Sequence, residues 1–153
     1  MKAASSPRKP QSVDNRRARY EYHILESLEA GIALTGTEIK SIRQGGISLA
    51  EAYARIRNGE AWLLGMHIPP YKEGSFSNVD PNRPRKLLLR KEQIVRLGSR
   101  VAEKGLTLVP LRLYFTRGKV KLEIGLARGK KLWDKRDRAA RRDVEREIAR
   151  NIR

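Results

Sequence analysis

The chain has 153 residues, a formal net charge of +17 and no cysteine. The lack of cysteine excludes disulfides, zinc sites built on thiolates and cysteine nucleophiles. No apolar run approaches the ~20 residues of a membrane-spanning helix, and no signal-peptide pattern follows the N-terminus, so we expect a soluble cytoplasmic protein.

The N-terminal part of the chain changes character near residue 15. Residues 1–14 are small, polar and proline-containing, which predicts a disordered basic arm. Residues 20–25 alternate and are rich in aromatic and β-branched side chains, which predicts a strand. Residues 28–34 are expected to continue as sheet, with Gly31 forming a bulge or a bend.

A short helix is predicted next, over residues 37–44. Ile39 and Ile42 lie three positions apart, Thr37 is a suitable N-cap, and two glycines follow the segment. The helix should therefore run for about two turns.

The middle of the chain reads as a hairpin followed by a long loop. Asn58 and Gly59 separate two alternating runs, at residues 52–57 and 61–68, and this dipeptide favours a tight hairpin turn. Residues 69–84 are rich in Pro, Asn, Gly and Ser. Such a long loop is either a functional element or a solvated excursion, and the sequence leaves both open.

Residues 91–103 have helical apolar spacing, and residues 106–115 and 120–127 alternate across Arg117-Gly118 as a second hairpin. In total the sequence predicts about six short strands and two or three helices. Many short antiparallel strands indicate a mainly β fold with flanking helices, arranged as a small closed barrel over residues 15–128.

Residues 129–153 form a distinct basic tail with ten basic and five acidic side chains. Its residues favour helix, but the helix would carry only a thin apolar stripe formed by Trp133 and four small or aliphatic residues. Without a core to dock on, the tail should be disordered alone and become helical on a large polyanion.

The excess of basic over acidic residues is typical of a nucleic-acid surface. Arginine enrichment for thermal stability is the alternative, but it would enrich both signs of charge. Arg16, Arg17, Arg19 and Tyr20 combine phosphate donors with a ring that can stack on a base. The Lys-rich start of the tail does the same around Trp133, although this ring could instead fold back onto the barrel.

Catalysis and metal binding have little support in the sequence. His23 and His67 have no ligand-spaced partners, and no P-loop, nucleophile elbow or dinucleotide fingerprint is present. The carboxylates Glu29, Glu38 and Glu51 could in principle form a nuclease site, but ion pairs with the surplus Arg and Lys are the simpler explanation. We therefore expect a non-enzymatic protein with no metal and no cofactor.

Four motifs give the chain a resemblance to a known family. Residues 15–22 (NRRARYEY), 29–43 (EAGIALTGTEIKSIR), 80–89 (DPNRPRKLLL) and 129–136 (GKKLWDKR) resemble, in this order, the signatures of the SmpB family, the bacterial SsrA-binding proteins that partner tmRNA. Arg90 and the Leu132-Trp133 pair depart from the residues common at those positions.

The resemblance implies an OB-like antiparallel barrel that binds the tRNA-like domain of tmRNA. The complex is then delivered, with elongation factor Tu carrying alanyl-tmRNA, to a ribosome stalled on an mRNA without a stop codon. The tail enters the empty mRNA channel of the small subunit, near the 16S rRNA of the decoding centre, and becomes helical, after which translation resumes on tmRNA. A monomeric adaptor without a membrane partner is expected; a structural ribosomal protein is the alternative.

Two groups of site residues follow from the matching motifs. The residues expected to contact tmRNA are Asn15, Arg16, Arg17, Arg19, Tyr20, Glu29, Lys40, Arg43, Arg85, Lys86, Leu88 and Arg90. The tail residues expected at the ribosomal decoding centre are Gly129, Lys130, Lys131, Trp133, Asp134, Lys135, Arg136 and Arg138.

Overall fold

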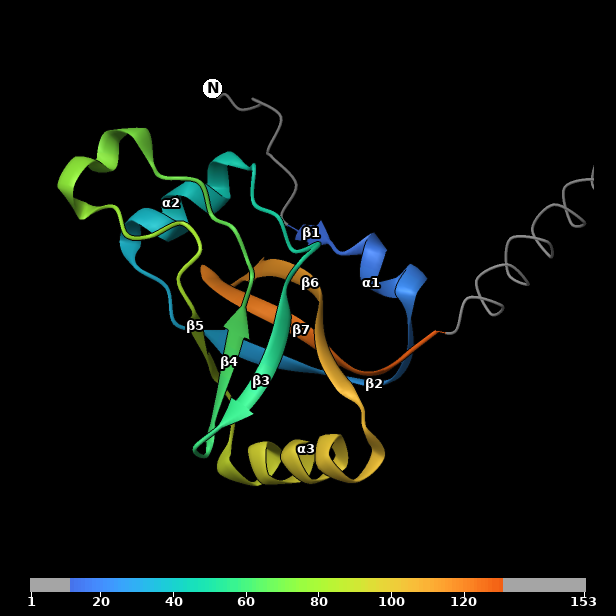
Figure 1. Ribbon diagram of the computed structural model, residues 1–153. Coiled ribbons are helices and arrows are strands. Elements are labelled where there is room, and N and C mark those ends of the chain that lie inside the picture. The colour runs from blue at the N-terminus through green and yellow to red at the C-terminus, as the bar shows by residue number, and fades with distance from the viewer. Residues whose placement is uncertain (1–11, 131–153) are drawn as a thin grey trace, which may run out of the picture.

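The computed structural model describes residues 12–130, which form one antiparallel sheet that closes on itself (Figure 1). The strand order is β1-β6-β3-β4-β5-β2-β7, and β6 also pairs with β7, so six strands complete a cycle and β1 adds to β6. The strands are β1 (Ser12–Asp14), β2 (Tyr22–Ile32), β3 (Tyr53–Arg57), β4 (Glu60–Leu64), β5 (Arg85–Leu88), β6 (Thr107–Thr116) and β7 (Lys119–Gly129). The predicted mainly β class with flanking helices is confirmed.

Within residues 12–130, three α-helices flank the sheet, and a 3-10 turn, Lys72–Ser77, lies within the long loop. In Figure 1, α3 lies at the bottom of the sheet, α2 at the upper left and α1 at the right. Glu26 of β2 holds α3 through ion pairs of 2.7 Å with Arg96 and 2.6 Å with Arg100. The helices are α1 (Arg16–Glu21), α2 (Gly36–Gln44) and α3 (Lys91–Lys104).

The two predicted hairpin turns are confirmed. Asn58 and Gly59 have φ values of 52° and 74° and connect β3 to β4, while Arg117 and Gly118, at 50° and 76°, connect β6 to β7. A turn with positive φ at both central residues matches the twist of the flanking strands. Few residues adopt positive φ easily, so such dipeptides indicate a hairpin in the sequence.

The start of the domain differs from the sequence-based expectation. Residues 16–21 form helix α1, and the two predicted strands at 20–25 and 28–34 are one continuous strand, β2. Residues 12–14 pair with β6 as β1, so this end of the predicted disordered arm is ordered; residues 1–11 lie outside the described part of the chain. The structure of residues 12–14 depends on pairing with the distant strand β6. A local sequence pattern cannot reveal such a pairing.

Three local assignments also change. The bulge in β2 lies between Ile24 and Glu26. It does not lie at Gly31, which pairs regularly with Leu88 and Lys121. A Cβ at Gly31 would lie 3.1 Å from the Cβ of Leu88, so the glycine permits a close strand approach. Thr35, and not Thr37, caps α2, and the predicted strand at 61–68 ends at Leu64.

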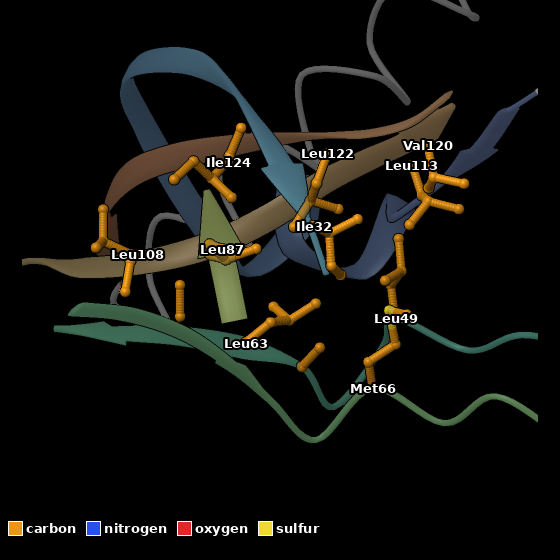
Figure 2. Close-up of a cluster of buried hydrophobic side chains, with 14 of the residues drawn as sticks. Ile32, Leu49, Leu63, Met66, Leu87, Leu108, Leu113, Val120, Leu122 and Ile124 are labelled. Atoms are coloured by element: carbon orange, nitrogen blue, oxygen red, sulfur yellow. The ribbon is translucent and has the colours of Figure 1, made fainter. Parts of the chain in front are cut away.

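Among the residues that the structure describes, two clusters of buried apolar side chains stabilise the domain. The larger one fills the inside of the sheet, where Leu63 and Met66 face Leu122 and Ile124 across the interior (Figure 2), and all four are 0% exposed. The smaller one lies beneath α1 and joins Ala18 to Val109, Leu111 and Ala127. A complete core of this kind is contained in residues 12–130.

Asn15 fixes the entrance to α1. Its side-chain oxygen accepts a bond from the backbone N–H of Ala18, and its amide nitrogen donates to the carbonyl oxygens of Leu49 (3.2 Å) and Pro110 (2.8 Å). The residue is only 4% exposed. The side chain thus caps the helix and ties it to two distant segments.

We expect Asn15→Ala to lower the free energy of unfolding by roughly 2–3 kcal/mol, because it removes a helix cap and two buried hydrogen bonds to the carbonyls of Leu49 and Pro110. Urea unfolding followed by circular dichroism measures this. The exposed Arg16→Ala is the control and should change stability by less than about 0.5 kcal/mol. Equal midpoints for the two variants would contradict this structural role.

Candidate nucleic-acid interface

The residues predicted to contact RNA separate into an exposed and a buried group. Asn15 and Arg85 are buried, at 4% and 0% exposure, and their polar groups are bonded inside the protein. Both therefore support the surface from beneath in this structure. The other ten, which reach the surface, are Arg16, Arg17, Arg19, Tyr20, Glu29, Lys40, Arg43, Lys86, Leu88 and Arg90.

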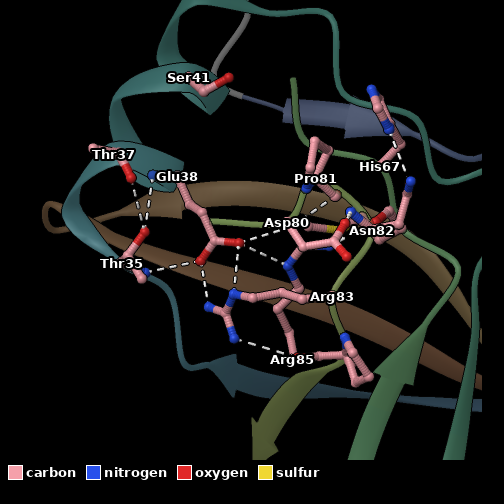
Figure 3. Close-up of polar contacts among 12 residues, drawn as sticks. Thr35, Thr37, Glu38, Ser41, His67, Asp80, Pro81, Asn82, Arg83 and Arg85 are labelled. Carbon is pink, nitrogen blue, oxygen red and sulfur yellow. Dashed lines mark hydrogen bonds and ion pairs between the residues drawn. The ribbon is translucent and has the colours of Figure 1, made fainter. Parts of the chain in front are cut away.

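Arg85 forms a buried ion pair with Glu38 (Figure 3). Its Nη2 lies 2.7 Å from Glu38 Oε2, and its Nη1 donates to the carbonyl of Met66 at 2.6 Å. Arg83 binds the same carboxylate from the loop side. Arg85 of β5 also donates to the carbonyl of Pro81 in the loop at 3.0 Å, so its bonds hold α2, the loop and β5 together.

Glu38 is also the third residue of α2 and completes a capping box with Thr35. The backbone N–H of Thr35 donates to Glu38 Oε1 at 2.9 Å, and that of Glu38 donates to Thr35 Oγ1 at 3.2 Å. Burial raises the pKa of Glu38, but bonds from Arg83, from the Thr35 backbone and from Arg85 outweigh burial and leave the pKa lowered. The carboxylate is therefore charged in the folded protein.

Helix α2 presents two cations outward on one face. The ammonium of Lys40 lies 5.7 Å from the ring centre of Tyr71, and the guanidinium of Arg43 lies 4.7 Å from that of Phe115. Each ring orients its cation while leaving charge at the surface. The two cations of this helix that are predicted to bind phosphate are thus exposed, and aromatic rings hold them in place.

A second polar surface lies around Glu29, on the strands β2, β7 and β6. Glu29 is directly opposite Glu123 in the sheet, and the hydroxyl of Tyr114 donates to the Glu29 carboxylate. Burial and the neighbouring Glu29 raise the pKa of Tyr114 to about 12. Arg112 lies 4.4 Å from the Tyr114 ring centre, so a carboxylate, a ring and a guanidinium occupy adjacent positions.

Two further predicted residues reach this surface from other elements. Arg19 of α1 lies 3.7 Å from Glu123, and Leu88 of β5 pairs with Gly31, two positions along β2 from Glu29. Residues two apart on a strand share a face. We call this set the Glu29 surface, and it consists of Arg19, Glu29, Leu88, Arg112, Tyr114 and Glu123.

Three members of the Glu29 surface, Arg112, Tyr114 and Glu123, are absent from the sequence-based set. Glu123 could have been found, because it alternates with inward-facing apolar residues of β7. Arg112 and Tyr114 are harder to place, because the register of β6 shifts between Pro110 and Arg112 and interrupts the alternation.

The other predicted residues have different neighbours. Arg17 forms ion pairs with Glu21, at 3.1 Å, and with Glu51. Lys86 lies 2.6 Å from Glu60, and Arg90 lies 3.6 Å from Glu92. All of these side chains are at least partly exposed, and exposed pairs of this kind exchange readily for phosphate.

At the end of β7, Gly129 is exposed and Lys130 is anchored. The backbone N–H of Lys130 donates to the carbonyl of Glu21 at 2.8 Å, and its ammonium donates to that of Arg19 at 3.4 Å. The remaining predicted tail residues lie outside the described part of the chain: Lys131, Trp133, Asp134, Lys135, Arg136 and Arg138.

The chemistry of the described surface suits recognition. Within residues 12–130 no group of three or more His, Asp or Glu side chains is arranged to hold a metal ion. None of the helices described there is long and apolar enough to span a membrane. Guanidinium groups bind phosphate, carboxylates accept bonds from base amino groups, and a tyrosine ring offers a stacking face.

Comparison with known proteins matches these features to one family. The family model described as SmpB protein matches residues 12–153. The SsrA-binding protein of Carboxydothermus hydrogenoformans is 56% identical over 141 residues, covering 92% of this chain and 95% of that protein. That of Trichodesmium erythraeum is 58% identical over 140 residues, covering 91% and 90%.

A solved structure is similar as well. It is described as "tmRNA-SmpB: a journey to the center of the bacterial ribosome", and one of its chains is 53% identical to this one, with a TM-score of 0.67. The match covers 80% of this chain and 87% of that chain. The sequence match includes both the described domain and the basic tail, and the chain belongs to the SmpB family.

Proposed function

We propose that this protein binds the tRNA-like domain of tmRNA and delivers it to stalled ribosomes for peptide tagging. The observation that carries the proposal is the family match over residues 12–153, which includes the folded domain and the tail together. Relatives that match over nearly the whole length of both chains are named SsrA-binding proteins. A similar chain is found in a structure of tmRNA, SmpB and the ribosome.

The described domain supplies the tmRNA-binding part of this function. Cations on α1 and α2 contact phosphates and set the position of the RNA. The Glu29 surface supplies specificity, since Glu29 accepts bonds from base amino groups and Arg112 with Tyr114 flanks a base or a ribose. The protein acts as an adaptor in the cytoplasm and needs no covalent step of its own.

The tail supplies the ribosomal part. Residues 129–153 enter the empty mRNA channel and form a helix there, near the decoding centre. Trp133 stacks on an rRNA base, Lys135 and Arg136 contact phosphates, and Asp134 caps the helix. Elongation factor Tu takes part indirectly, through alanyl-tmRNA.

One experiment tests the function as a whole and separates it from a structural ribosomal role. The tagged protein is purified from bacterial cells translating an mRNA without a stop codon, and its RNA is sequenced. An adaptor carries tmRNA and is present at far less than one copy per ribosome. One copy on every ribosome, with rRNA and no tmRNA, would support the structural alternative.

The Glu29 surface gives the first functional prediction. Glu29→Arg should weaken tmRNA binding by about tenfold, because losing a base contact costs on the order of 1–3 kcal/mol. The change raises the net charge by two, so bulk electrostatics alone would tighten binding. Glu103→Arg, an exposed change of equal charge on α3, is the matched control in the same filter-binding assay. Tighter binding by Glu29→Arg would remove Glu29 from the interface.

A second functional prediction concerns the start of the tail. Replacing Asp134, Lys135 and Arg136 together by Ala should leave tmRNA and ribosome binding almost unchanged but abolish alanine transfer to the stalled peptide. The net charge falls by only one. Arg141→Ala lowers it equally and should retain transfer. Normal transfer by the triple variant would show that these three residues are not needed after delivery.

A further inference from the structure

The outer face of β3, β4 and β5 carries an aromatic ring between two cations. Arg55 of β3 lies directly opposite Trp62 of β4, and Trp62 lies directly opposite Lys86 of β5. The Cβ atoms of such opposed residues are about 5 Å apart, so both cations lie beside the ring. All three alternate with more buried residues along their strands and therefore point outward. In Figure 1 the hairpin of β3 and β4 lies at the front of the sheet.

A hollow of about 350 Å³ opens on this face beside Trp62. Arg55 and Arg57 line it from β3, and Asn58 lines it from the hairpin turn. The volume is within the range of sites that bind small ligands, and a single nucleobase is a ligand of this size. The hollow therefore offers a ring, cations and an amide to one flat, polar group.

The charges around the hollow favour an anionic partner. Arg55 and Arg57 are exposed and form no ion pair with any residue in the described range 12–130. Glu60 lies opposite Arg57 in the sheet, but its carboxylate pairs with Lys86 at 2.6 Å. Among the described outward residues of β3, β4 and β5, three cations thus accompany one carboxylate. Such a face attracts a polyanion.

Strand β5 connects this face to the Glu29 surface. Lys86 lies two positions before Leu88, which belongs to the Glu29 surface, and both side chains are exposed. Residues two apart on a strand share a face and lie about 7 Å from each other. An RNA strand that leaves the Glu29 surface can therefore cross β5 and reach Trp62 within one or two nucleotides.

We propose that an unpaired nucleotide of tmRNA stacks on Trp62 in this hollow, beyond the part of the RNA held at the Glu29 surface. The inference rests on the proposed function and adds a second contact to it. Every base offers a flat face to an indole ring, and Arg55 and Lys86 contact the phosphates on its two sides. The amide of Asn58 both donates and accepts, so it bonds the edge of the base.

Tryptophan fluorescence in the full-length protein tests the contact. Trp133→Phe leaves Trp62 as the only tryptophan of the chain. We expect tmRNA to quench the emission of Trp62 in this protein, over the same concentrations at which a gel shift shows the RNA to bind. In this background Arg55→Ala should raise the RNA concentration needed by about fourfold at moderate salt, because one phosphate contact is lost. Arg96→Ala removes an equal charge from α3, where Arg96 pairs with Glu26, and is the matched control that should leave the titration unchanged.

The affinity of the RNA gives a second measurement. Trp62→Ala should weaken tmRNA binding by about tenfold, and Trp62→Phe, which keeps a ring, by less than about threefold. Thermal unfolding shows whether each variant is folded. If Trp62→Ala does not fold, the quenching of Trp62 and the comparison of Arg55→Ala with Arg96→Ala decide the matter.

The other outcomes overturn the inference. Unchanged Trp62 emission while the gel shift shows bound tmRNA would reject the contact and leave the proposed function intact. An absence of any tmRNA binding would reject both. Quenching by ribosomes but not by tmRNA would make rRNA the occupant of the hollow. Equal effects of Arg55→Ala and Arg96→Ala would mean that only the overall charge matters.

Discussion

A protein that ends at Lys130 should bind tmRNA nearly as tightly as the full chain and yet fail completely to support tagging on stalled ribosomes. Both apolar clusters lie within residues 12–130, so the truncated domain keeps its core and the Glu29 surface. The removed residues 131–153 carry nine basic and five acidic side chains, a net loss of four positive charges. Such a loss weakens general RNA affinity modestly and mainly alters its salt dependence.

The truncation is read out by tmRNA binding and by tagging in a cell-free translation system with an mRNA that lacks a stop codon. Thermal unfolding of the truncated protein is the control and should give a transition close to that of the full chain. Loss of tmRNA binding would place part of the interface in the tail. Retained tagging would show that the tail has no role on the ribosome.

Glu38→Ala should destabilise the domain strongly, with a loss of roughly 3–5 kcal/mol, because it leaves a buried guanidinium without its carboxylate. Arg85 is 0% exposed, and Arg83 and the cap of α2 depend on the same carboxylate. Chemical unfolding measures the loss. Glu60→Ala breaks the exposed pair with Lys86 and should cost at most about 1 kcal/mol. Similar losses for the two variants would mean that the Glu38 network adds no special stability.

The same carboxylate gives the stability a pH dependence. The pKa of Glu38 is lowered in the folded protein, so its contribution is fully present above the unfolded value of about 4.3 and is lost as the pH falls through the folded value. The wild type should therefore lose stability in acid more steeply than Glu38→Gln, whose side chain does not titrate. Parallel acid unfolding curves would contradict the assignment.

The sequence predicted those parts of the fold that depend on local chemistry. The Asn58-Gly59 and Arg117-Gly118 turns are visible because positive φ restricts the residue choice, and α3 is visible from its apolar spacing. The short strand β1 and the helix α1 were not predicted. Each depends on β6, about 95 residues away, through bonds such as that from Asn15 to Pro110.

The same limit applies to the candidate site. Asn15 and Arg85 belong to motifs rich in RNA-binding residues, and their polar side chains look no different in sequence from those of Arg16 or Lys86. Their partners, Pro110 and Glu38, lie 95 and 47 residues away. Burial therefore distinguishes residues that support the interface from residues that can touch RNA. The burial of a residue can be seen only in the folded chain.

Specific recognition of tmRNA by this protein can be measured in a gel shift with the purified full-length protein. Labelled tmRNA is titrated with the protein at moderate salt, against an excess of unlabelled tmRNA, of an ordinary tRNA or of an unrelated structured RNA. We expect a discrete complex that only unlabelled tmRNA competes away efficiently. Equal competition by all three RNAs would mean that the protein binds polyanions in general and does not recognise tmRNA.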